Sequence, residues 1–187
     1  MGLWSAGRPR PATDMHPSGR ARRLSPVAPS DEKIVKIKVA WIGKTKEPAI
    51  QTLTEEYLKR IGRYAEVAGL ALKDEAAILS LATGEGQKKQ KQKKKERHKL
   101  VLVDARGKQL TSEELAEFLE REQVNATPLL FAIGGSDGFS DDARRCAGFT
   151  LSLGKMTLPH ELARVVLVEQ LYRAFTILAN HPYHLGH

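Results

Sequence analysis

The chain has 187 residues, enough for one domain of ordinary size, and 41% of them are hydrophobic, which permits a packed core and excludes wholesale disorder. Its formal net charge is +8, and no apolar run approaches the roughly 20 residues of a membrane-spanning helix, which predicts a soluble protein. The single cysteine, Cys146, excludes an intramolecular disulfide and is typical of a reducing compartment, so we expect a cytoplasmic protein.

The positive charge is concentrated in two segments. Residues 1–30 carry a net charge of +4 and residues 87–99 a net charge of +7, so the rest of the chain sums to −3. We therefore expect no basic face on the folded part that could neutralise phosphates across a whole nucleic-acid footprint. The lysine-rich run is typical of a solvated loop or frayed helix end, and it would attract an anionic partner without recognising it.

Residues 1–30 contain five prolines and few large apolar side chains, which predicts a disordered basic extension before a single domain at 31–187. Their composition resembles that of an organelle transit peptide. The alternative, which we favour, is a start codon assigned too far upstream.

Strands and helices alternate in the first half of the domain. Residues 34–42 mix alternating polarity with β-branched side chains, which predicts a strand, and apolar residues at helical spacing predict a helix over 48–63. A weaker strand candidate follows at 65–72 and a short helix at 74–82.

The second half of the domain continues this alternation and predicts an α/β fold with a mostly parallel sheet flanked by helices. The expected elements are a strand at 100–103, a helix capped by Thr111 or Ser112, a strand at 128–133, a helix capped by Ser140, a strand at 149–153 and a long helix from Pro159 to about Ala179. The long helix is apolar on nearly all sides and needs cover beyond one sheet, so we expect a homodimer built on it.

Three loops follow the carboxyl ends of predicted strands, where open α/β sheets bind ligands. They span 103–107, 134–138 and 153–160. The second loop matches neither the dinucleotide nor the P-loop fingerprint, which makes an oxidoreductase remote, and acidic residues beside it would repel a pyrophosphate. It suits a ligand with a neutral or cationic reactive centre, or it is a simple tight turn. The third loop could line an adenine pocket or form a hydrophobic staple before the helix.

The tail suggests a metal site through the spacing of His181, His184 and His187, but no cysteine or carboxylate lies nearby in sequence, and we expect no metal. Tyr183 and His184 could instead stack on and hydrogen-bond an exposed base. Cys146 lies on a predicted amphipathic helix, where we expect a buried packing role rather than a nucleophilic one.

Four segments taken together resemble a known family. They are IGGSDG at 133–138, LSLGKMTLPH at 151–160, RVVLVEQLYRAF at 164–175 and NHPYH at 180–184. This combination closely resembles ribosomal RNA large subunit methyltransferase H, a bacterial family of the SPOUT class, over about residues 34–184. The sequence differs from the family in residues 1–30, in the lysine-rich segment 83–99 and in the last three residues.

The resemblance implies a deep trefoil knot near the C-terminus, a homodimer, and methyl transfer from S-adenosylmethionine to N3 of a pseudouridine in 23S rRNA of the assembled ribosome. From the composition and the chemistry of the tail we expect no membrane and no metal as partners. A non-enzymatic ribosome-associated RNA-binding factor that retains the fold is the alternative.

The resemblance also implies roles for individual residues. The cofactor contacts carry over to Val103, Gly134, Leu153, Gly154, Lys155, Met156, Thr157 and Leu158. The substrate-side residues are Tyr183 and His184 of the tail and Arg164 and Arg173 of the long helix. His184 or Tyr183 is the candidate base for the acceptor proton, with Arg173 stabilising the negative charge that develops.

Overall fold

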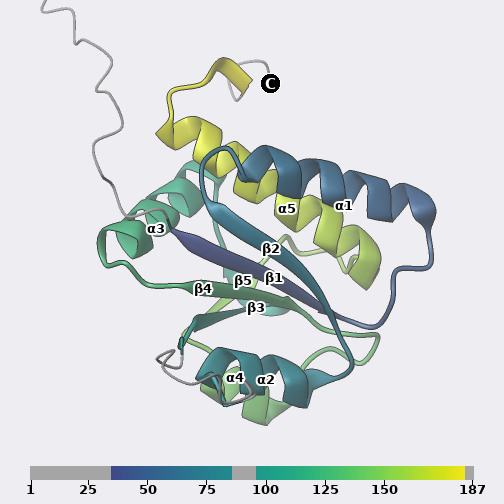
Figure 1. The fold of residues 1–187 in the computed structure, drawn as a ribbon. Coiled ribbons are helices and arrows are strands. Elements are labelled where there is room, and N and C mark those ends of the chain that lie inside the picture. The colour runs from purple at the N-terminus through teal and green to yellow at the C-terminus, as the bar shows by residue number, and fades with distance from the viewer. Residues whose placement is uncertain (1–34, 86–95, 184–187) are drawn as a thin grey trace, which may run out of the picture. The chain divides into compact units, whose positions relative to one another are not determined.

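The structure is a computed structural model that describes residues 35–85 and 96–183. Five strands and five helices alternate along these residues (Figure 1). In chain order they are β1 (Lys36–Ile42), α1 (Pro48–Ile61), β2 (Glu66–Leu72), α2 (Glu75–Thr83), β3 (Lys99–Gln109), α3 (Ser112–Val124), β4 (Leu129–Ile133), α4 (Asp141–Cys146), β5 (Phe149–Ser152) and α5 (His160–Leu178).

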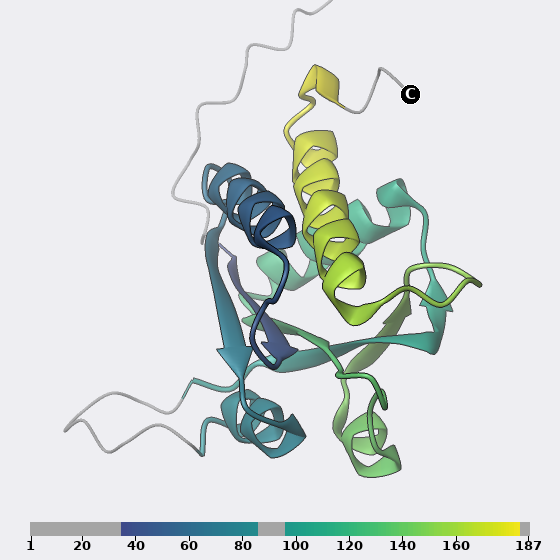
Figure 2. The same ribbon diagram turned by 90° about the vertical axis from the view of Figure 1, so that its right-hand side faces the viewer.

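The strands form one sheet in the order β2-β1-β4-β3-β5, and all four neighbouring pairs are parallel. Helices α1, α3 and α5 cover one face, and α2 and α4 cover the other, so the domain has three layers (Figures 1 and 2). The predicted α/β fold with a parallel sheet is confirmed. Within the described residues no helix is long and apolar enough to cross a membrane.

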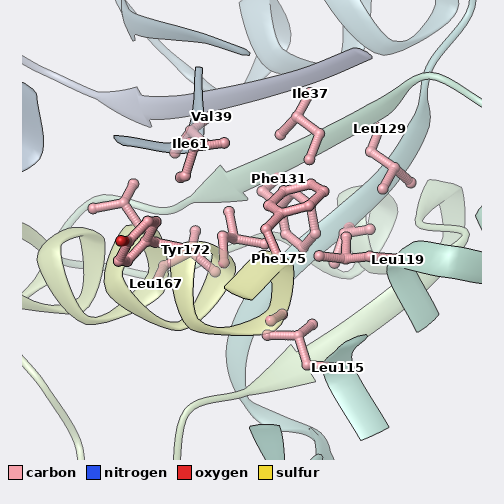
Figure 3. Close-up of a cluster of buried hydrophobic side chains, with 14 of the residues drawn as sticks. Ile37, Val39, Ile61, Leu115, Leu119, Leu129, Phe131, Leu167, Tyr172 and Phe175 are labelled. Carbon is pink, nitrogen blue, oxygen red and sulfur yellow. The ribbon is translucent and has the colours of Figure 1, made fainter. Parts of the chain in front are cut away.

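The larger hydrophobic cluster lies between the sheet and the α1, α3 and α5 layer (Figure 3). Ile37 and Phe131 point from neighbouring strands toward Leu167 and Phe175 of α5, and all four are at most 3% exposed. Burying a side chain of this size contributes about 1.5–3 kcal/mol. Helix α5 is therefore fixed in place by the core, and its first turns lie at the carboxyl edge of the sheet.

Local sequence signals account for where the helices begin. Thr111, not Ser112, caps α3, and it forms a reciprocal capping box with Glu114. Ser140 caps α4 through a hydrogen bond from the Ala143 N–H, and Pro159 precedes the first turn of α5. The predicted elements agree with the observed ones within two residues at most ends.

Two predictions about this fold are wrong. Strand β3 runs to Gln109 and resumes pairing with β5 after a register shift between Val103 and Lys108, so residues 104–107 are a bulge within a strand and not a strand-end loop. Cys146 is exposed, because it is the last residue of the six-residue helix α4 and faces away from the core.

Other predictions lie outside the described residues. These are the N-terminal extension 1–30, most of the lysine-rich run and the tail from His184 onward. The trefoil knot and the homodimer also stay predictions at this stage.

Candidate cofactor-binding site

A cavity of about 660 Å³ opens at the carboxyl ends of β4 and β5 and at the bulge within β3. We call it the strand-end cavity. Val103 and Ile133 line it from the strands, and the segment Leu153–His160 closes it on the side of α5. Because the sheet is parallel, segments far apart in sequence end at the same edge, which is where α/β sheets bind ligands.

Two glycines shape the walls of this cavity. A Cβ on Gly134 would lie 3.1 Å from the backbone of Gly138, because the loop folds back on itself through a hydrogen bond from the Gly138 N–H to the Gly135 carbonyl. Gly154 has a φ of +147°, which side chains rarely adopt. Backbone atoms of both loops therefore come close to the cavity, where they can hydrogen-bond a flat heterocycle.

On the wall formed by the β3 bulge and α4, Arg144 pairs with two carboxylates. Arg144 donates to the Asp104 carboxylate through Nε at 3.0 Å and Nη2 at 2.9 Å, and its Nη1 lies 2.9 Å from Asp141. Burial alone raises the pKa of the Asp104 carboxyl, but the Arg106 N–H and the Arg144 guanidinium outweigh it and hold the pKa below its ordinary value. Asp104 is therefore ionised at neutral pH and ties the bulge in β3 to helix α4.

The acidic character predicted for the second loop is largely compensated. Asp141 pairs with Arg144 and Asp142 with Arg145, while the exposed Asp137 does not line the cavity. Asp104 is the acidic side chain that reaches the lining. Sequence reasoning placed Asp104 in a candidate loop but missed its pairing with Arg144, because the pair spans 40 residues and leaves no periodic signal.

Seven of the eight predicted cofactor residues line the strand-end cavity, and Lys155 does not. They are Val103, Gly134, Leu153, Gly154, Met156, Thr157 and Leu158. Met156 is 82% exposed, so an apolar, flexible side chain stands at the rim. The cavity therefore combines apolar walls with accessible backbone groups, as a site for a neutral ring requires.

Of the predicted substrate-side residues that the structure describes, none lines this cavity. Tyr183 donates a hydrogen bond to the Glu169 carboxylate at 3.2 Å, and Arg173 donates to the same oxygen at 2.8 and 3.1 Å. The ring of Tyr183 meets Tyr172 edge-on with centroids 4.8 Å apart. These residues form a cluster along α5, about 9–15 Å along the helix axis from Ala163 of the cavity.

The environment of this cluster fixes the protonation of Tyr183. Burial raises the pKa of the Tyr183 phenol above its ordinary value of 10, and Tyr57 and Glu169 add to the rise. The phenol therefore stays protonated at neutral pH and acts as a hydrogen-bond donor. His184, the other candidate base, lies outside the described residues.

Arg164 belongs neither to the strand-end cavity nor to the cluster around Tyr183. Its side chain is buried between α1 and the sheet, where it donates to Thr54 and lines a separate pocket. Among the described residues no group of three or more His, Cys, Asp or Glu side chains could hold a metal ion, and His184 and His187 of the proposed histidine motif fall beyond them.

Comparison with known proteins assigns the family. The family described as "Predicted SPOUT methyltransferase" matches residues 35–184. Two curated relatives are both named ribosomal RNA large subunit methyltransferase H. The one from Koribacter versatilis is 55% identical over 155 residues, 82% of this chain and 100% of its own length. The one from Geobacter sulfurreducens is 42% identical over 152 residues, 80% of this chain and 99% of its own.

Solved structures are more distant. A probable methylase family protein from Haemophilus influenzae Rd KW20 is 16% identical with a TM-score of 0.48, covering 80% of this chain and 70% of its own, a likeness too distant to add to the assignment. The sequence match spans the whole described domain, including all three walls of the strand-end cavity. This chain therefore belongs to the SPOUT methyltransferase family.

Proposed function

We propose that this enzyme transfers a methyl group from S-adenosylmethionine to N3 of a pseudouridine in 23S rRNA of the assembled ribosome. Methyl transfer from that donor is the activity of its family. The names of its relatives, at 55% and 42% identity over their full lengths, support ribosomal RNA as the substrate. The single observation that carries the proposal is the strand-end cavity, whose lining contains seven of the eight expected cofactor residues. Such a substrate implies a cytoplasmic enzyme.

The residues of the strand-end cavity fit this donor. A Cβ at Gly134 would crowd the Gly138 backbone, so the wall there is made of backbone groups that can hydrogen-bond an adenine edge. Val103, Leu153 and Leu158 provide apolar contacts for the ring. The ion-paired Asp104 and Arg144 add no net charge, and the remaining arginine of the lining, Arg106, is exposed, so water screens its charge.

The chemistry divides between the strand-end cavity and the cluster of Tyr183, Glu169 and Arg173. When bound, S-adenosylmethionine supplies an electrophilic methyl group. The main demand on the protein is then to hold the acceptor N3 in line with that methyl. Because Tyr183 keeps its proton, we assign the role of general base to His184, which takes the N3 proton. Tyr183 and Arg173 orient the pseudouridine ring and stabilise the negative charge that develops on it.

The enzyme acts as a homodimer in this proposal. Leu162 of α5 is 42% exposed and Leu53 of the neighbouring α1 is 45% exposed, which leaves apolar area on the outer side of the helical layer. Within one subunit the Tyr183 cluster lies apart from the strand-end cavity. A second subunit packed on this layer would both cover the apolar area and supply substrate-side residues to the cavity.

Ribosomes from a strain lacking this protein provide the test. We expect the purified enzyme to add one methyl group to a pseudouridine of 23S rRNA, detected by mass mapping, and to act on assembled ribosomes in preference to naked rRNA. The Gly134→Val variant is the matched negative control. A methyl on another base, or no methyl with a cofactor-competent enzyme, would show that the proposed substrate is wrong.

A further inference from the structure

A second cavity of about 520 Å³ lies on the other side of α5. It opens at the carboxyl ends of β1 and β2, and we call it the Trp41–Arg164 pocket. It shares no lining residue with the strand-end cavity, but Ala163 lines one and Arg164 the other. The first turns of α5 therefore form the partition between two neighbouring cavities at one edge of the sheet.

The pocket contains a buried positive charge. Arg164 is 1% exposed, its Nε donates to the Thr54 hydroxyl at 3.2 Å, and its guanidinium carbon lies 4.3 Å from the centre of the Trp41 ring. Within residues 35–85 and 96–183, no carboxylate lies within 4.0 Å of this guanidinium. A charge held out of water without an ionic partner is costly, so the site favours an anion.

Two buried hydrogen-bond donors of the pocket also lack an acceptor. Over the same described residues, Nη2 of Arg164 and Nε1 of Trp41 are both buried without a hydrogen-bond partner. Burial lowers the pKa of Arg164 and the charge of Glu161 on α5 opposes this, but the Glu161 carboxylate accepts a hydrogen bond from the Lys46 N–H. The Thr54 hydroxyl itself donates to the Ile50 carbonyl. The unmet demand is for acceptor oxygens.

The residues at the mouth and in the walls of the pocket indicate which chemical group supplies the acceptor oxygens. Lys44 is exposed at the rim and adds a second positive charge, whereas the Glu55 carboxylate accepts a hydrogen bond from Gln51. Leu58 and Ala71 provide apolar wall beside Trp41. A volume of about 520 Å³ exceeds that of one phosphate and accommodates an attached sugar. Arginine is the residue best suited to bind phosphate through several oxygens.

We propose that the Trp41–Arg164 pocket binds a phosphate group of the RNA chain beside the nucleotide that is methylated at the strand-end cavity. The assignment of RNA as the source rests on the proposed function, whereas the phosphate site can be tested without it. Because consecutive residues of α5 line the two cavities, a phosphate held at Arg164 fixes the RNA backbone next to the reacting base.

Trp41 reports directly on the pocket. The chain has two tryptophans, so the full chain carrying Trp4→Phe emits from Trp41 alone. Inorganic phosphate is titrated at ionic strength held constant with sodium chloride. We expect a saturable change in emission that Arg164→Met weakens at least tenfold. Arg121→Met removes a guanidinium that lies over the Phe118 ring on α3 and is expected to bind phosphate as the parent does.

Failure of Arg164→Met to fold would not end the test, because Thr54→Val removes the hydrogen bond that orients Arg164 and leaves the charge in place. Circular dichroism and melting check both variants. A linear response in the parent, or an equal response in the variants, overturns the phosphate site.

Steady-state methylation identifies the source of the phosphate. We expect Arg164→Met to raise the KM for RNA about tenfold while the affinity for S-adenosylmethionine and the kinetics of Arg121→Met stay unchanged. An unchanged KM together with lost phosphate binding would assign the pocket to a small phosphorylated molecule and overturn the RNA assignment. Phosphate binding by a chain that methylates no RNA would instead refute the proposed function alone.

Discussion

Arg144 shows how single side chains hold the strand-end cavity in shape. Its guanidinium joins Asp104 in the bulge of β3 to Asp141 at the start of α4. The Asp104 side chain is 9% exposed and that of Arg144 is 23% exposed, so the pair is only partly screened by water. An interaction of this kind fixes a wall and leaves the apolar lining available to a ligand.

We predict that Asp104→Asn lowers the free energy of unfolding by about 1 kcal/mol, because Arg144 loses its more buried carboxylate. The native pKa of Asp104 lies below its ordinary value of 3.8, so its contribution is present above that pH and is lost as the pH falls through the native pKa. Denaturant unfolding between pH 7 and pH 3 measures this. Asp142→Asn is the control, because its pair with Arg145 is more than 70% exposed on both sides. An equal loss in both variants would contradict the prediction.

Gly134 is predicted to be essential for cofactor binding. The Gly134→Val side chain would collide with the Gly138 backbone, which a Cβ alone approaches to 3.1 Å, and would push the loop into the strand-end cavity. We expect isothermal titration calorimetry to show at least a tenfold, about 1.4 kcal/mol, loss of S-adenosylmethionine affinity. Gly135→Ala meets only Ile42 at 3.8 Å and is expected to bind more tightly than Gly134→Val. Normal affinity of the valine variant would refute the assignment of the site.

His98 gives the fold a dependence on mildly acidic pH. Burial lowers the pKa of its imidazole below the ordinary 6.5, Lys38 lowers it further, and Glu96 opposes both. The unfolded chain therefore binds a proton near pH 6.5 that the folded chain does not. Stability is full above that pH and falls as the pH drops below it, by up to about 1.4 kcal/mol per pH unit.

We predict that His98→Leu removes this fall, measured as the free energy of unfolding at pH 7.5 and pH 5.5. His160→Gln replaces an exposed histidine and is expected to keep the parent's pH dependence. A parent whose stability is constant over this range would show that His98 is not the cause.

At the scale of elements, local patterns predicted most of the fold. Helical spacing, β-branched runs and caps such as Ser140 depend on residues within a few positions of one another, so the sequence alone predicts them. The extension of β3 and the exposure of Cys146 depend on pairing and packing between distant elements. The same holds for Arg164, whose contact with Thr54 spans 110 residues. The loops after β4 and β5 were predictable as a site because parallel strands must share a carboxyl edge, whereas the bulge at 104–107 depends on how β3 pairs with β5.

Helix α5 carries the prediction about assembly. Leu162→Glu adds a charge to the exposed apolar area near Leu53, so we expect the dimer to dissociate, with sedimentation velocity showing a shift from dimer to monomer. Val124→Glu changes an 80% exposed residue at the end of α3 and is the control, expected to stay dimeric. A dimeric Leu162→Glu variant would move the interface away from this face of α5.

For the whole molecule, the distribution of charge separates attraction from recognition. The sequence outside residues 1–30 and 87–99 sums to −3, so the domain that carries both cavities is not itself a polycation. Its positive side chains near the cavities are few and specifically placed, as Arg144 beside Asp104 and Arg164 beside Trp41 illustrate. We therefore expect the two basic segments to supply the long-range attraction to ribosomal RNA.

The lysine-rich run carries the last prediction. Replacing the six lysines at positions 88–95 by glutamine is expected to weaken RNA association at low salt and to leave cofactor affinity unchanged, because we expect the run to supply electrostatic attraction rather than cofactor contacts. Each lysine that neutralises a phosphate contributes about 0.7 to the slope of log affinity against log salt. Binding measured between 50 and 200 mM salt, roughly the range over which such contacts are lost, reveals the change in slope.

Deletion of residues 1–30, which removes a net charge of +4, is the control: folding and cofactor binding are expected to survive it. A slope unchanged by the six substitutions would assign the attraction to other residues, and the pocket at Arg164 would be the first place to look.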